Sequence, residues 1–429
     1  MGAAVFALLA TACSSSSPTS TPTTTVPTGG TPSAGRGTFT YGFDFSTQGP
    51  TTGAGNDSAS VSSAQHVLSR FAGSYMDQSI WGFGATTSPE PSPGKYNMSA
   101  IARRIHLIDS VGGIPVITLV SAPNWMKDPA ASSANLFRKP PSPSHFADFA
   151  ALCAHVAASF PQVKYFVVWS ELRGFFLPKS KSWDGPGYTK MYNDVYAAIK
   201  AVRPDAQIGG PYANLSASSV PIGGASSTLK GSWGYLDQSM ADAMSYWLAH
   251  KAGAEFVAVD GGTEIAKADN PTLTDIVTAS QKYAAVDHWI RSQTDLPIWW
   301  MESHIQPHSG WTSQQAATAR IATLLLMASS GASVGMQWQP QEQSNWPDQG
   351  LWTSTLNAGG GRPTLLADEL QQVLPVLSGQ VVLMAGEPAG VLVARTGSHT
   401  IAVNTTGAIV HAVVTTGVLT LAPYSLSVR

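Results

Sequence analysis

Charge and cysteine are both scarce in this sequence, and each shortage excludes a class of protein. Charged residues make up 12% of the 429-residue chain, against roughly 25% in ordinary soluble domains. The 24 Lys and Arg and 26 Asp and Glu leave a formal net charge of −2, so there is no basic excess to hold a nucleic-acid backbone. Two cysteines exclude a disulfide framework. No apolar run reaches the roughly 18 residues that cross a bilayer.

Apolar and aromatic residues are plentiful instead. Hydrophobic residues account for 43% of the chain, enough to bury a sizeable core, which excludes a globally disordered protein. The 13 tryptophans nearly equal the 14 phenylalanines. Tryptophan suits positions where its ring stacks against the apolar face of a ligand. Strand ends and loops that carry tryptophan are therefore candidate binding positions.

The first cysteine ends an apolar segment, Val5–Cys13, whose last residues are small. This segment is similar to the lipobox of bacterial lipoprotein signal peptides, in which cleavage leaves the cysteine as a lipidated N-terminus. We therefore expect residues 1–13 to be a lipoprotein-type signal segment with Cys13 as the lipidation site. The alternative is an ordinary secretory signal in which the cysteine is incidental.

The next segment, residues 14–38, supports export under either interpretation. Eighteen of its 25 residues are Ser, Thr or Pro, and it contains no aromatic residue. A segment with so little to bury is expected to be a disordered linker. We expect the protein to be exported to the cell envelope, lipid-anchored to the outer face of the cytoplasmic membrane, or else secreted. A lipid anchor would be its only contact with a membrane.

Short β-rich segments then alternate with longer helical ones, a pattern typical of a parallel sheet built from βα units. The eight predicted strands are Phe39–Phe45, Ser79–Gly84, Ile114–Val120, Tyr165–Trp169, Gln207–Pro211, Phe256–Val259, Ile298–Met301 and Val334–Trp338. The predicted helices include Ile101–Val111, Phe146–Ala158, Tyr188–Val202, Ile276–Ser292 and Gln314–Ser329. Eight such units predict an α/β fold in which residues 39–372 form a (β/α)8 TIM barrel. No Gly-rich phosphate turn follows the first strand, which argues against a doubly wound sheet.

The pattern changes near residue 373. Short alternating strands joined by Gly, Thr and Ser turns follow, at Val391–Arg395, Thr400–Val403, Ala408–Val414 and Val418–Leu421. They predict a small C-terminal all-β domain over residues 373–429. About 55 residues make a thin independent core, so this domain is expected to pack on the barrel.

Two of the predicted barrel strands end abruptly in a glutamate. Glu171 follows the fourth strand and Glu302 follows the seventh. Active sites of (β/α)8 barrels lie at the carboxyl ends of the strands, so both side chains are expected at one mouth of the barrel. Two such glutamates, one protonated as general acid and one ionised as nucleophile, meet the requirement for glycoside hydrolysis. Either residue alone would be better explained by a strand-end salt bridge.

The arrangement resembles the retaining glycoside hydrolases of clan A, whose acid/base Glu follows strand four and whose nucleophile Glu follows strand seven. Further segments are similar to members around families 39 and 5. They are the Pro-x-Trp turn in Ser121–Met126, the helix-four to strand-five segment Tyr188–Pro211, the pair Gln337 and Trp338 on strand eight, and the barrel-closing segment Gly350–Pro363. The resemblance implies a retaining glycosidase in which Glu171 is the acid/base and Glu302 the nucleophile.

The sequence departs from this pattern at two positions. The clan usually has Asn immediately before the acid/base Glu, where it hydrogen-bonds the sugar 2-hydroxyl, whereas this chain has Ser170. The His that often ends strand six also has no obvious match, and Asp260 stands in that neighbourhood. Ser170 either reflects a substrate that presents its 2-hydroxyl differently or marks a site that has lost activity.

Other residues at the strand ends are candidate substrate-binding groups. Asp44 ends the first strand and can bind a sugar hydroxyl or cap a loop. Trp125 and Trp338 can stack on a sugar face or belong to the core, and Gln337 precedes the strand-eight Trp. His304 can orient the nucleophile or a substrate hydroxyl. His304 and His308 are four residues apart, but Pro307 between them argues against a helical metal site.

These observations favour an exported retaining glycoside hydrolase that acts on an extracellular or cell-envelope polysaccharide or oligosaccharide and needs no cofactor or metal. The partner it implies is a carbohydrate substrate. One alternative is a catalytically weak glycan-binding envelope lipoprotein, motivated by Ser170. Another is a structural envelope protein whose barrel serves protein partners. The fold alone does not identify the sugar or the linkage.

Overall fold

A computed structural model of the chain describes residues 38–45, 56–83, 85, 87–132, 136–222, 227–266, 275–305, 311–342, 349–377, 379–414 and 417–429. The expected signal segment with Cys13, and all but the last residue of the expected linker, lie outside these residues. Residues 34–429 form one compact unit. Among the described residues no helix is long and apolar enough to cross a membrane.

Eight parallel strands close into a barrel, so the fold class expected from the sequence is confirmed. In chain order the barrel strands are β1 (Thr40–Asp44), β2 (Tyr75–Ser79), β3 (Ile114–Leu119), β4 (Tyr165–Val168), β7 (Gln207–Asn214), β11 (Phe256–Gly262), β13 (Ile298–His304) and β14 (Ala332–Trp338). Each strand pairs with the next one in this order, and β14 pairs with β1 to close the ring. All of their carboxyl ends therefore lie at one mouth of the barrel.

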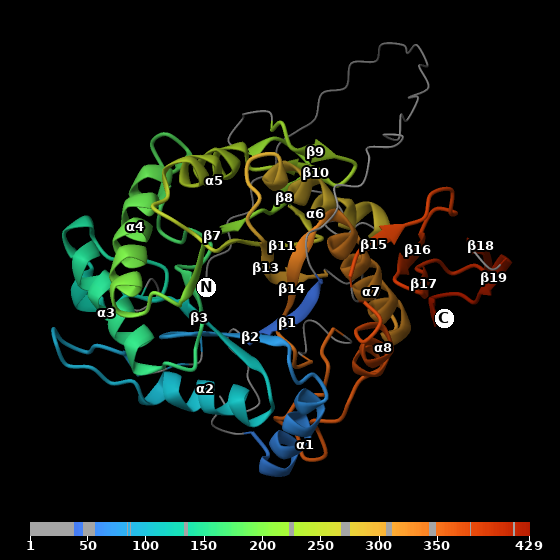
Figure 1. The fold of residues 1–429 in the computed structure, drawn as a ribbon, viewed down its shortest axis with the longest axis horizontal. Coiled ribbons are helices and arrows are strands. Elements are labelled where there is room, and N and C mark those ends of the chain that lie inside the picture. The colour runs from blue at the N-terminus through green and yellow to red at the C-terminus, as the bar shows by residue number, and fades with distance from the viewer. Residues whose placement is uncertain are drawn as a thin grey trace, which may run out of the picture. The chain divides into compact units, whose positions relative to one another are not determined.

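Helices surround the strands, as Figure 1 shows. They are α1 (Ser58–Ser69), α2 (Ser99–Ser110), α3 (Phe146–Ser159), α4 (Gly185–Val202), α5 (Gln238–His250), α6 (Ile276–Arg291), α7 (Ser313–Ser330) and α8 (Leu365–Val373). Their apolar faces and the outward side chains of the strands form the main core of the molecule. The buried Cys153 belongs to this core on α3, as a small apolar side chain does.

Inward-pointing aromatic side chains fill the barrel below its mouth. Phe256 and Trp299 stack with ring centroids 4.0 Å apart, and Tyr75 and Tyr165 also contact Trp299. These rings come from β2, β4, β11 and β13. Because side chains alternate along a strand, every second residue after these rings also points into the barrel, nearer its mouth. The aromatic layer is thus the base on which the polar site rests.

Helix α7 is buried on nearly every side. It contacts α6, α8 and β14, and also the strands β15, β16, β17 and β20 that follow the barrel. A helix that is covered all round has little amphipathic signal. Its ends are sharply defined, because Thr312 and Gln315 form a reciprocal capping box and Gly331 ends the helix at φ 100°.

The C-terminal segment forms antiparallel sheets. Strands β15 (Val381–Leu383), β16 (Val391–Thr396), β17 (His399–Asn404) and β20 (Ser425–Val428) make one sheet, and β18 (Val410–Val414) pairs with β19 (Gly417–Leu421). Alternate residues of β16 and β17 face two cores. Ala394 and Ile401 join the main core, while Val393 and Ala402 pack with β18 and β19. This region therefore packs against the barrel helices, as its small size predicts.

One predicted strand is wrong. The strand expected at Ser79–Gly84 is not found at residues 80–83, and the second barrel strand, β2, lies earlier, at Tyr75–Ser79. The polar residues Asp77 and Gln78 interrupt the apolar pattern of β2, whereas the following loop contains the apolar residues Trp81 and Phe83 and was therefore mistaken for the strand. Strands β7, β11 and β13 also extend three residues beyond the predicted ends, and polar side chains occupy most of that extra length.

Candidate active site

Glu171 stands in a strained turn directly after β4. Trp169, Glu171 and Leu172 have φ of 69°, 52° and 49°, in the left-handed region that non-glycine residues avoid. Such residues cost on the order of 1–3 kcal/mol each and cluster at functional sites. The turn is held by bonds from its own neighbours, since the Trp169 indole donates to the Arg173 carbonyl at 2.9 Å. The result is a carboxylate aimed at the mouth of the barrel.

Two neighbours bind the carboxylate of Glu171. Arg173 forms an ion pair with Oε2, and the Asn214 amide donates to Oε1 at 2.8 Å. The same Asn214 amide nitrogen donates to Asp260 Oδ2, also at 2.8 Å. Asn214 ends β7 and Asp260 lies near the end of β11, so three neighbouring strand ends meet at this carboxylate.

Glu302 lies on β13, across the mouth from Glu171. The Tyr212 hydroxyl donates to Glu302 Oε1 at 2.7 Å, which fixes one carboxylate oxygen and leaves Oε2 for chemistry. Tyr212 is itself buried and has φ of 55°, so its side chain is aimed by a second strained position, near the end of β7. Tyr212 is a site residue that was not among the candidates expected from the sequence.

The carboxylates of Glu171, Asp260 and Glu302 approach closely. One oxygen from each lies within 4.8 Å of the others. Retaining glycosidases place their two carboxyl groups about 5–5.5 Å apart, whereas inverting ones leave about 6.5–9.5 Å for a water. The oxygen-to-oxygen approach of Glu171 and Glu302 is short enough for both side chains to reach one bond of a bound molecule. Asp260, near the end of β11, is the third member of this group.

The three carboxyls have different environments. Burial raises the pKa of Glu302 well above its ordinary value, and the charges of Asp44 and Glu171 act in the same direction. Burial and the charges of Glu302 and Glu171 likewise raise the pKa of Asp260. Both shifts disfavour the charged form, and Asp260 is joined to Glu171 by a side-chain hydrogen bond.

Glu171 has the opposite shift. Burial raises its pKa, but Arg173 and the hydrogen bonds from Asp260 and Asn214 outweigh burial, so the pKa lies below its ordinary value. A general acid that is ready to react needs the reverse order, with Glu171 neutral and Glu302 charged. The carboxyls are close enough to titrate together, so the proton belongs to the group rather than to one residue.

Glu302 also faces a small cavity at the floor of the mouth, of about 10 Å³. Its polar lining includes Asp44, Asp77, Ser170 and Tyr212. Asp77 is buried, and the Thr118 hydroxyl donates to its carboxylate, with the two carboxylate oxygens 2.8 and 2.9 Å away; burial raises the pKa of Asp77 to about 7. The expected candidates Asp44 and Ser170 therefore lie beside the expected nucleophile.

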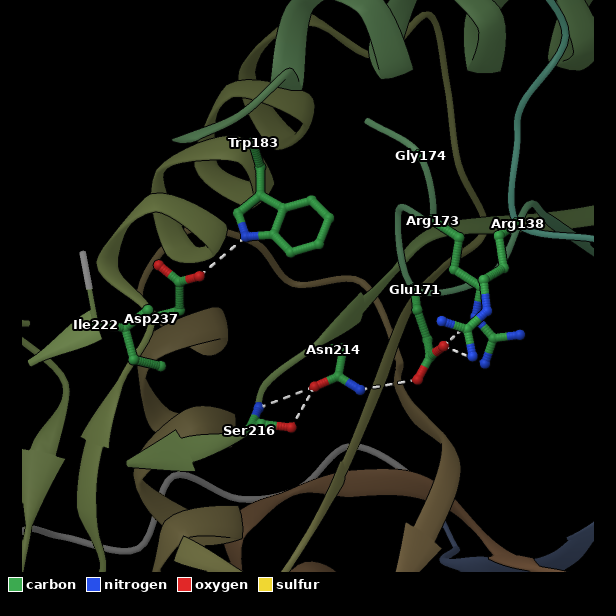
Figure 2. A pocket seen from close by; sticks show the side chains of 9 residues that line it. All are labelled: Arg138, Glu171, Arg173, Gly174, Trp183, Asn214, Ser216, Ile222 and Asp237. Carbon is green, nitrogen blue, oxygen red and sulfur yellow. Dashed lines mark hydrogen bonds and ion pairs between the residues drawn. The ribbon is translucent and has the colours of Figure 1, made fainter. Parts of the chain in front are cut away.

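Glu171 faces a much larger cavity of about 560 Å³, shown in Figure 2. Its lining includes Arg138, Arg173, Trp183, Asn214 and Ser216. The Trp183 indole donates to Asp237 at 2.9 Å, which holds the ring on the far side of the cavity from Glu171. The two glutamates thus border two different spaces, a polar floor and a wider, aromatic and basic outer cavity.

Four other candidates lie outside both cavities. His304 pairs with Glu264 at 3.0 Å, and the Trp338 ring centroid lies 5.5 Å from that of His304. Gln337 is fully buried, with its amide occupied by Tyr41 and Gln349. The Trp125 indole donates to the Glu90 carbonyl at 3.0 Å and is partly buried. Gln337 thus makes hydrogen bonds within the barrel wall, and the other three contact protein groups outside the two cavities.

The carboxylate group also offers oxygen ligands of the kind that hard divalent cations prefer. Protein donors bind both oxygens of Glu171 and one oxygen each of Asp260 and Glu302: Asn214 bridges Glu171 and Asp260, Arg173 binds Glu171, and Tyr212 binds Glu302. A cation bound here would have to compete with these donors.

Some site residues that were not expected could have been found from their positions in the sequence. Tyr212 and Asn214 directly follow a predicted strand, and polar residues at that position are the first to inspect in this fold. Arg173 lies only two residues from Glu171. Asp77 gave no such signal, because its strand was misplaced.

Comparisons with solved structures agree with this architecture. The chain is similar to a family 39 glycoside hydrolase from the gut symbiont Bacteroides cellulosilyticus WH2, with a TM-score of 0.58 and 14% identity over 91% of this chain and 80% of that one. A family 39 β-xylosidase from Caulobacter crescentus gives 0.54 and 17%, over 89% and 78% of the two chains. A family 30 subfamily 8 xylanase from Clostridium acetobutylicum gives 0.53 and 10%, over 88% and 84%.

At these identities the similarity establishes a shared fold. No family model matches the chain, and no curated protein matches it by sequence. The protein therefore has the barrel fold of family 39 and family 30 glycoside hydrolases, and its activity has to be argued from its own site.

Proposed function

We propose that the protein is a retaining glycoside hydrolase. The observation that carries the proposal is the close approach of Glu171 and Glu302 at the ends of β4 and β13. The shared fold with glycoside hydrolases supports it. The catalytic residues are Glu171 and Glu302, and a carbohydrate is the substrate.

In the first step Glu302 attacks the anomeric carbon through Oε2, while Tyr212 holds its other oxygen. The bond from that carbon to the leaving oxygen breaks as Glu171 transfers its proton to that oxygen. In the second step Glu171 takes a proton from water, the resulting hydroxide attacks the anomeric carbon, and the ester bond to Glu302 breaks. Configuration at the anomeric carbon is retained after two inversions.

The floor cavity has room for about one water, so a sugar ring has to displace side chains there. Phe83 lines the floor, and the Arg173 guanidinium lies 4.8 Å from its ring. Asp44 and Asp77 then meet the sugar hydroxyls. Since Ser170 replaces the usual Asn, the amide nearest to Glu171 comes from Asn214 on β7 instead.

A specific observation favours a second candidate, a glycan-binding protein with little or no turnover. Arg173 and Asn214 favour the charged form of Glu171, and burial disfavours the charged form of Glu302. A site that remained in this state would bind a glycan without cleaving it.

A panel of fluorogenic α- and β-glycosides, pyranosides and furanosides, separates the two candidates. The glycosidase predicts release of the fluorophore from at least one glycone, and loss of that release in Glu302→Gln. Binding of a glycan by calorimetry with no release from any member of the panel would support the second candidate.

Export and lipid anchoring are part of the proposal and rest on the sequence around Cys13. Expression of the full chain with radiolabelled palmitate tests them. Label on the wild type and none on Cys13→Ser supports the anchor, and equal label on both contradicts it.

A further inference from the structure

The outer cavity beside Glu171 has a chemistry that retaining hydrolysis does not require. Its lining includes two arginines, Arg138 and Arg173, from two different loops. In a chain with 12% charged residues, two guanidinium groups on one cavity beside a catalytic carboxylate are a marked local concentration of positive charge.

Arg173 keeps donors free for a ligand. Its Nε and Nη2 both serve Glu171, and no partner for Nη1 occurs among the described residues. Stacking against Phe83 at 4.8 Å orients the guanidinium plane. An oriented guanidinium matches the two oxygens of a carboxylate.

Arg138 is exposed, and within the described part of the chain it has no hydrogen bond or ion pair. Its loop is held against the turn after β4, because a Cβ at Gly174 would lie 2.8 Å from the Arg138 carbonyl and 2.2 Å from the ring of Pro140. The two arginine-bearing segments therefore pack closely against each other at Gly174. Among the described residues of the lining, Asp237 is the acidic residue besides Glu171, and it accepts bonds from the Trp183 indole and from the Ser239 backbone N–H at the start of α5.

We propose that this cavity binds the leaving group of the substrate, and that this leaving group is an acidic sugar whose carboxylate pairs with Arg138 and Arg173 while its ring packs on Trp183. The inference rests on the proposed function, because Glu171 marks the leaving-group side. A sulfate ester offers the same anionic chemistry from another source.

The pairing has a consequence for the proton donor. A carboxylate bound to the free Nη1 of Arg173 places a second negative charge beside Glu171. That charge disfavours the ionised form of Glu171, while the guanidinium stays stacked on Phe83. Binding of the acidic leaving group thus moves Glu171 toward its protonated, proton-donating form.

The test uses the full-length protein and aryl glycosides of whichever glycone the panel identifies. The 4-carboxyphenyl glycoside carries the anion, the 4-carbamoylphenyl glycoside is its neutral counterpart, and the 4-sulfophenyl glycoside represents the sulfate source. We expect kcat/KM to favour an anionic probe over the neutral one by about tenfold or more. A ratio near one in the wild type would overturn the proposal.

Two variants locate the effect. Arg138→Gln is expected to bring the ratio of kcat/KM between the anionic and neutral probes down toward one. Lys179→Gln removes the same charge from an exposed position between β5 (Phe176–Leu177) and β6 (Ser182–Trp183) that does not line the cavity, and is expected to keep the ratio. A ratio that survives Arg138→Gln, or falls equally in Lys179→Gln, would contradict the assignment.

Binding separates this inference from the proposed function. Calorimetry compares a disaccharide whose reducing-end residue is a uronic acid with its carboxyl-reduced form, which differs only at the acidic group. Tighter binding of the acid that is lost in Arg138→Gln supports the anion site even if no glycoside is cleaved. Equal binding of the two sugars contradicts it even if hydrolysis is observed.

Discussion

Arg173 binds the carboxylate of Glu171 from only two residues further along the same turn. Both Nε and Nη2 are directed at Oε2, and Asn214 takes the other oxygen. The residue that has to donate a proton in the proposed reaction is thus held in the form that has lost it. Whatever moves Arg173 controls the acid, which makes this ion pair the most informative contact of the site.

Replacing Arg173 with Gln is expected to raise the pKa of Glu171, because an adjacent arginine lowers a carboxyl pKa by about 1–3 units. A general acid works below its pKa, so the alkaline limb of kcat/KM against pH moves to higher pH. The acidic limb moves in the same direction, since Arg173 also lowers the pKa of Glu302. Profiles measured on a neutral aryl glycoside check this, with Lys179→Gln as control. Unmoved limbs in Arg173→Gln would show that the pair does not govern protonation.

Removing the Glu171 side chain separates its role from that of Glu302. In Glu171→Ala, kcat/KM on substrates with poor leaving groups is expected to fall by about 10²–10⁴. Activated aryl glycosides lose much less, because their leaving oxygen needs little protonation. Added azide then yields a glycosyl azide with retained configuration. Equal losses on both substrate types would place the acid elsewhere.

The Tyr212 hydroxyl is expected to stabilise the ionised nucleophile. Hydrogen bonds to charged groups contribute about 1.5–3 kcal/mol, so Tyr212→Phe is expected to lower kcat roughly 10- to 150-fold. The pKa of Glu302 rises when the donor is lost, and the acidic limb of the pH profile moves to higher pH. Tyr246→Phe on α5 is the matched control, since no partner for its hydroxyl occurs among the described residues. An unchanged kcat in Tyr212→Phe would remove Tyr212 from the mechanism.

Ser170 tests whether the floor is adapted to its sugar. It is buried and borders a cavity of about 10 Å³ beside Glu302, so the larger amide in Ser170→Asn is expected to crowd the site and lower kcat/KM. Measurement of wild type and variant on furanosides and pyranosides decides this. A gain on pyranosides, with no turnover of furanosides by either protein, would indicate a decayed pyranosidase instead.

The sequence was sufficient to predict the barrel because seven of its eight strands are apolar runs at regular spacing. The remaining strand, β2, carries the polar residues Asp77 and Gln78 near the mouth of the barrel, and these interrupt its apolar pattern. The predicted end of β7 was too early for the same reason, because Tyr212 and Asn214 continue the strand into the site. The apolar pattern that identifies a strand is thus weakest where the strand carries site residues.

The pair Glu171 and Glu302 could be selected from the sequence because each ends an apolar run. Tyr212 and Asn214 could not be assigned to those carboxylates, because hydrogen-bond partners from different strands depend on the register and tilt of the closed sheet. Gln337 shows the converse. It lies one residue before the end of β14 and resembles a substrate contact in sequence, yet its amide is occupied by Tyr41 and Gln349.

Trapping the covalent intermediate tests the central claim, that Glu302 is the nucleophile of a retaining glycosidase. A 2-deoxy-2-fluoro glycoside of the cleaved glycone, with an activated leaving group, slows release of the intermediate more than its formation. We predict a mass increase of one fluoroglycosyl unit, located by peptide mapping on Glu302 and absent in Glu302→Gln. A label on Glu171, or turnover of the normal substrate with no label on any residue, would contradict the account.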